Sequence, residues 1–179
     1  MLSRPRILFP KTKFYVSNKG TTVRTRISLY LFLLISMVVQ IILRKYLGWF
    51  PDLSLLMVVF VGIFFGWGEV VVFCLIAGVF RGSFSDSTFL IDIILFPAVG
   101  LICSALKNLF YKNNPVAQAF MTTAALTIVI GVHISYLNIT DIGTMSILSV
   151  WRSSWKSIVM TIVLSPVIFL FLKEQTRVE

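Results

Sequence analysis

The side chains best suited to chemistry are ionisable groups at the ends of long apolar runs. Arg81 ends one run, Asp92 begins the next, and the only histidine, His133, lies late in a third. If these runs cross a membrane, the three groups lie at a similar depth, near the outer face. Charges at that depth are expensive unless they are paired. The sequence therefore predicts a buried polar cluster in which Asp92 pairs with His133 or Arg81, with Asp86 in the connection nearby.

Two interpretations of this cluster stay open. The first is a polar pocket open to the periplasm, or a contact point for a partner. The second is an ion pair that only fixes helix packing, or side chains that reach lipid headgroups. Mutating Asp92 and His133 singly and together would show whether the two side chains act as a pair or independently.

The sequence gives little support for catalysis or metal binding. Ser83 or Ser85 with His133 could supply a nucleophile and a base, but neither G-x-S-x-G nor H-E-x-x-H occurs. Cys74 and Cys103 both lie inside apolar runs and are expected to be small buried side chains. We therefore expect a non-enzymatic protein with no catalytic residue, no metal and no cofactor.

The composition places these groups in a membrane protein. The chain has 179 residues, of which 58% are hydrophobic and 13% charged, and its mean hydropathy is +0.94. Globular domains outside membranes are about 45–50% apolar and about 25% charged. The formal net charge of +9 comes largely from the N-terminal arm and from the edges of the apolar runs, as in topology signals. Nucleic-acid binding is not expected, because no motif for it accompanies the charge.

The expected fold is all-α, with about six transmembrane helices. Residues 1–26 form a basic cytoplasmic arm, 27–172 the transmembrane domain and 173–179 a cytoplasmic tail. Residues 66–69, Gly-Trp-Gly-Glu, divide an apolar stretch that is too long for one span. The expected spans are 27–43, 53–66, 69–80, 89–106, 115–137 and 157–172, with an interfacial helix at 145–156.

Aromatic and basic residues set the expected orientation. All four tryptophans lie at span edges, where they would act as interfacial anchors: Trp49, Trp67, Trp151 and Trp155. Basic residues are more numerous on the side that carries the arm, which places both termini in the cytoplasm. We also expect membrane lipids as partners, because the arm would lie on anionic headgroups.

Glycines spaced four apart predict close helix contacts. Gly62 with Gly66, and Gly78 with Gly82, each match G-x-x-x-G. Such spacing lets another helix approach closely, either within the chain or from a partner. A second candidate partner surface is the helix around Leu148, Trp151 and Trp155.

The stretch from Pro51 to Lys107 resembles a known family. Pro51-Asp52-Leu53 opens an apolar run, the glycines at 62, 66 and 78 follow, and Gly100 lies near the end of the run at 89–106. This pattern is similar to that of MreD, the rod shape-determining membrane protein of bacteria. The resemblance implies a scaffold subunit of the cell-elongation complex, which makes peptidoglycan at the bacterial inner membrane.

The resemblance also implies partners and an alternative. MreD-like proteins work with the bitopic protein MreC, and indirectly with an actin-like filament and wall synthases (RodA and its transpeptidase). Their fold is similar to that of the substrate-binding subunit of energy-coupling factor transporters, so a vitamin-binding transporter subunit is the alternative function. Such subunits commonly use Ala-x-x-x-Ala in the first span, and residues 27–43 contain no alanine.

Overall fold

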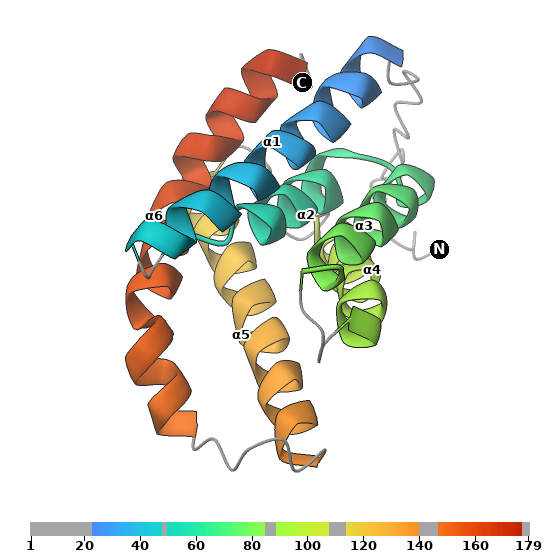
Figure 1. Ribbon diagram of the computed structural model, residues 1–179. Coiled ribbons are helices and arrows are strands. Elements are labelled where there is room, and N and C mark those ends of the chain that lie inside the picture. The colour runs from blue at the N-terminus through green and yellow to red at the C-terminus, as the bar shows by residue number, and fades with distance from the viewer. Residues whose placement is uncertain (1–22, 48–49, 85–88, 108–113, 140–146, 177–179) are drawn as a thin grey trace, which may run out of the picture.

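The computed structural model describes residues 23–47, 50–84, 89–107, 114–139 and 147–176, and within these ranges helices are joined by short turns, with no strand (Figure 1). The predicted all-α fold of six helices is confirmed. The arm up to residue 22 and the last three residues lie outside the described ranges. The helices are α1 (Val23–Leu47), α2 (Leu53–Phe64), α3 (Trp67–Gly82), α4 (Phe89–Leu106), α5 (Pro115–Ile139) and α6 (Ile147–Thr176).

Helix α2 forms the centre of the fold. All but two of its twelve residues are buried, and it contacts each of the other five helices. Its sequence is apolar on every side, which suits a helix enclosed by protein. Asp52 caps its N-terminus by accepting a hydrogen bond from the Leu55 N–H. The core around it includes Phe60, which packs edge-on against Phe169 of α6.

Four of the described helices are long and apolar enough to cross a membrane, namely α1, α4, α5 and α6. Helix α2 is apolar but spans only about 18 Å, less than the ~30 Å of hydrocarbon in a bilayer. The number of helices supports a multi-pass membrane protein. Six spans would require α2 and α3 to reach both faces of the membrane, and this stays a prediction.

Three of the four glycines in the G-x-x-x-G matches, Gly62, Gly78 and Gly82, are covered by α4. A Cβ on Gly62 would lie 2.8 Å from the Gly100 carbonyl oxygen, and one on Gly78 would lie 2.5 Å from that of Asp92. One on Gly82 would lie 2.8 Å from the Phe89 ring. These faces therefore serve contacts inside the chain and leave no room there for a partner helix. Of the four glycines in the two G-x-x-x-G matches, only Gly66, just before α3, faces open space.

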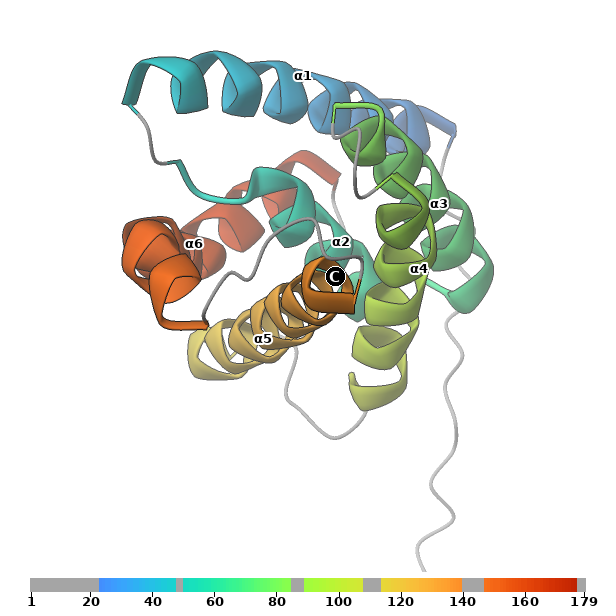
Figure 2. The same ribbon diagram turned by 60° about the horizontal axis from the view of Figure 1, so that its bottom comes forward.

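Helix α6 is continuous from Ile147 to Thr176, whereas the sequence predicted an interfacial helix and a separate span. No proline or glycine interrupts residues 147–165, so nothing in the sequence breaks the helix there. Pro166 lies further on and cannot donate to the Ile162 carbonyl, which the Ser165 hydroxyl satisfies instead at 2.8 Å. In Figure 2 the two halves of α6 point in different directions.

The start of α1 and the end of α6 lie at the same end of the molecule (Figure 1). At the opposite end, α5 and the first turns of α6 extend past the junction of α1 and α2. The polar groups singled out in the sequence lie at that junction.

A buried polar cluster at the junction of five helices

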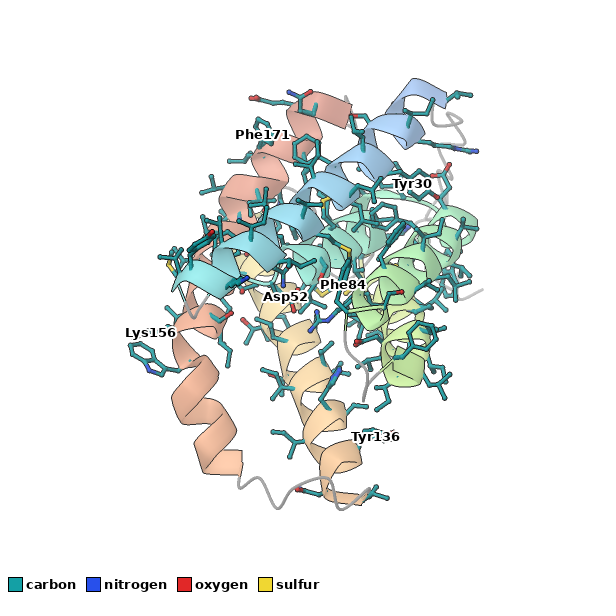
Figure 3. All side chains as sticks on the ribbon, viewed as in Figure 1. Tyr30, Asp52, Phe84, Tyr136, Lys156 and Phe171 are labelled. Atoms are coloured by element: carbon teal, nitrogen blue, oxygen red, sulfur yellow. The ribbon has the colours of Figure 1, made fainter. Side chains whose placement is uncertain are left out.

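Five helices bring their polar side chains together at the N-terminus of α2. Arg81 comes from the last turn of α3, Asp92 from the first turn of α4 and His133 from α5. Asp52, just before α2, completes the group, and Figure 3 shows it well inside the molecule. We call Asp52, Arg81, Asp92 and His133 the polar cluster.

Asp52 makes the shortest contacts in the polar cluster. One carboxylate oxygen accepts from Arg81 Nη1 at 2.5 Å. The other accepts from the Ser54 hydroxyl at 2.7 Å and from the Leu55 N–H at 3.1 Å. The same side chain therefore caps α2 and ties it to α3.

Helix α6 holds the backbone on either side of Pro51. The Thr161 hydroxyl accepts from the Asp52 N–H at 2.9 Å and donates to the Ser157 carbonyl at 2.7 Å. One turn earlier, the Ser157 hydroxyl donates to the Phe50 carbonyl. Two hydroxyls four residues apart lie on one helical face. The segment at residues 50–52 is therefore fixed to α6, and Asp52 with it.

Asp92 and His133 lie against each other between α4 and α5. His133 Nδ1 lies 2.8 Å from the Val129 carbonyl, which can only accept, so Nδ1 carries a hydrogen. His133 Nε2 lies 3.2 Å from Asp92 Oδ1. At this distance the two side chains can hold one proton between them, as imidazolium with carboxylate or as neutral imidazole with carboxylic acid.

Charge balance explains how such groups tolerate burial. Arg81 Nε lies 3.8 Å from Asp92 Oδ1. The Arg81 guanidinium therefore contacts both acids of the cluster, Asp52 and Asp92. With one proton on the Asp92–His133 pair, the polar cluster is neutral in either arrangement. Its side chains are 1–25% exposed, and Asp92 is the most buried. Separated charges would be expensive in this setting, whereas a compensated set can be buried.

The arrangement does not resemble a metal centre. Within the described ranges, no three histidine, cysteine or acidic residues lie close enough to hold a metal ion. Cys74 and Cys103 are both buried, and Cys74 packs against Gly100. Two acids, one arginine and one histidine in contact can hold a proton or an ion pair.

The structure brings three predicted residues together and leaves others elsewhere. Arg81, Asp92 and His133 meet, whereas Asp86 lies outside the described residues. Trp49 and the side chain of Trp151 also lie outside them, while Trp67 and Trp155 are exposed. Sequence reasoning missed Asp52, Ser54, Ser157 and Thr161. A Pro-Asp pair before an apolar run was a signal for the helix cap. No pattern in the local sequence indicated that Asp52 contacts residues 29 or more positions away.

These features define a class: an all-helical, multi-pass membrane protein whose internal charges join its helices to one another. The family model described as rod shape-determining protein MreD matches residues 20–175, nearly the whole chain. The chain therefore belongs to the MreD family. No curated protein and no solved structure matches it. The likeness to the transporter subunit, which the resemblance implied, stays a prediction.

Proposed function

We propose that this protein is a non-enzymatic scaffold subunit of the bacterial cell-elongation complex and helps to determine rod shape. The observation that carries the proposal is the family match, which covers all six helices. The protein would act in the inner membrane with both termini in the cytoplasm. Its partners would be an MreC-like bitopic protein and, through it, the actin-like filament and the wall synthases.

The polar cluster supports a structural role. Its ion pairs and hydrogen bonds join α2 to α3 and α6, and α4 to α3 and α5. A compensated set of charges buried between helices resists separation, because removing one partner strands the other. A protein that holds other subunits in place benefits from helices that keep a fixed arrangement.

Two exposed apolar faces are the proposed places for the single span of a bitopic partner. On α6, residues spaced mostly four apart form a stripe: Trp155, Val159, Val163, Val167 and Leu170. On α1, a second stripe consists of Ile27, Leu31, Ile35, Val38 and Ile42. Residues at this spacing share one side of a helix, which suits lengthwise contact with another helix.

The test is purification of the tagged chain from membranes of a rod-shaped bacterium, with photo-crosslinkers at Val163 on α6 and Leu31 on α1. A crosslinker at Val72 of α3, which is also exposed, serves as the control position. We expect an MreC-like protein to be captured from α6 or α1 and not from α3. Recovery of an ATPase-coupled transmembrane subunit, without any wall-synthesis protein, would show that the scaffold proposal is wrong.

A further inference from the structure

A cavity of about 310 Å³ lies between α1, α3 and the end of α2, away from the polar cluster. Its walls are formed mainly by six side chains: Leu29, Tyr30, Val61, Phe65, Val72 and Phe73. Five of these are apolar, and the Tyr30 ring packs against Phe73 at 5.5 Å between centroids. Walls of this kind suit a hydrocarbon ligand and do not offer the polar partners that a sugar or nucleotide needs.

One ion pair lies at the edge of this cavity. Arg26 Nη2 is 2.7 Å from Glu69 Oε1, and both residues line the cavity. They are much more exposed than the polar cluster, at 54% and 30% of their side chains. A guanidinium has five N–H donors in a planar fork, so it can serve two oxyanions at once.

The neighbouring surface is apolar where it would face lipid. On α1, Ile27 and Leu31 are exposed, and on α3 so are Val72 and Leu75. Trp67 begins α3 at the same end of the molecule and is 58% exposed, as expected of a side chain at a membrane interface. The cavity therefore lies between two surfaces that lipid chains would contact, close to headgroup level.

Among the described residues, two cations and one acid lie at this cavity: Arg26 and Glu69 line it, and Lys107 contacts its wall. Lys107, at the end of α4, donates to the Phe65 carbonyl at 2.7 Å, and Phe65 lines the cavity. Basic pockets between membrane helices attract anionic headgroups.

We propose that this cavity binds one acyl chain of an anionic phospholipid, whose phosphate contacts Arg26. The apolar walls hold the chain, and Arg26 selects an anionic headgroup. The binding site is separate from the polar cluster and does not depend on the scaffold function.

Two glycines give a matched pair of variants for the test. Gly68 lines the cavity, and a Cβ there would meet nothing within 4 Å, so Gly68→Leu would project into the entrance without displacing the backbone. Gly66 is equally open, lies two residues away and does not line the cavity. Gly66→Leu is therefore the control.

The probe is phosphatidylglycerol, offered to the purified full chain in detergent with an equal amount of phosphatidylcholine of the same chain length. Native mass spectrometry counts the bound lipids. We expect one retained phosphatidylglycerol per chain, a loss of at least tenfold in Gly68→Leu and no loss in Gly66→Leu. Arg26→Gln should abolish the preference for phosphatidylglycerol, whereas Lys45→Gln, at the other end of α1, should preserve it.

Three results would overturn the proposal: no retained lipid in the wild type, equal retention of the two lipids, or retention by Gly68→Leu that matches the wild type. Loss of lipid in both glycine variants would also overturn it, because binding would then not depend on the cavity. Partner capture by crosslinking reports on the scaffold proposal and is independent of each of these results.

Discussion

Asp52 shows how one residue can serve two parts of a fold. Its carboxylate caps α2 through the Leu55 N–H and also receives Arg81 from α3. Its backbone N–H donates to Thr161 on α6. Substitution of the Asp52 side chain would affect the start of α2 and the contact with α3 together, whereas the backbone contact with α6 would remain. The ion pair is therefore better tested at Arg81.

Arg81→Ala should lower the free energy of unfolding by about 3–5 kcal/mol, because it leaves two buried acids without their shared cation. Arg26→Ala, which breaks an exposed ion pair, should cost about 1 kcal/mol or less. Thermal and denaturant unfolding in detergent micelles measures both. Equal losses in the two variants would contradict the structural role of the polar cluster.

Asp92→Asn and His133→Ala should each destabilise the protein, and the double variant should lose less than the sum of the two. The reason is that each single change leaves the other side chain buried without its partner. Ser135→Ala is the control on α5, since the Ser135 hydroxyl is exposed and bonds only within its own helix. Additive losses in unfolding experiments would mean that Asp92 and His133 act independently.

The residues of the polar cluster differ in how far the sequence could predict them. Arg81, Asp92 and His133 could be grouped from the sequence because ionisable residues are rare in apolar runs. Their positions along these runs also indicate a similar depth in the membrane. Asp52 could not be added, because it sits in a turn where aspartate is common for local reasons. Its contact with Arg81 depends on how α2 packs against α3, which no local pattern encodes.

At the scale of the helices, glycine sets how closely α4 approaches α2 and α3. The Gly78 backbone lies so near Asp92 and Ile93 that even a methyl group would clash with main-chain atoms. Asp92 belongs to the same contact, so the packing of α3 on α4 also positions the polar cluster.

Gly78→Ala should lower the free energy of unfolding by about 1–3 kcal/mol, the usual range for overpacking. Gly131→Ala on α5 is the matched control, because its Cβ would meet nothing within 4 Å. That change should be neutral or should stabilise the protein by about 0.5–1 kcal/mol, as alanine favours helix. A neutral Gly78→Ala in the same unfolding assay would contradict the described α3–α4 contact.

At the scale of the whole molecule, we predict that the start of α1 and the end of α6 lie on the same side of the membrane. Figure 1 places the start of α1 and the end of α6 at the same end. We expect a fluorescent protein fused to the C-terminus to report the cytoplasm, and a phosphatase fused there to be inactive. An active phosphatase at the C-terminus would rule out an even number of crossings.

Most of the fold followed from the sequence because hydropathy and helix breakers act locally. The apolar run at 89–106 forms α4, and the break predicted at residues 66–69 lies at residues 65–66 in the structure, between α2 and α3. The prediction differed from the structure at α6. Polar residues at 149–156 suggested a separate helix, whereas α6 is continuous. A change of polarity along a helix marks a change of surroundings, but only a glycine or proline would have marked an end.

The shortness of α2 has a consequence for how the protein enters the membrane during synthesis. At about 18 Å, α2 cannot be held across a bilayer on its own, so the insertion machinery would not release it as a separate segment. The α2–α3 turn exposes backbone groups that lipid cannot satisfy, and Lys107 satisfies the Phe65 carbonyl only once α4 has been made. We therefore expect residues 53–82 to enter the membrane together with α4 and not before it.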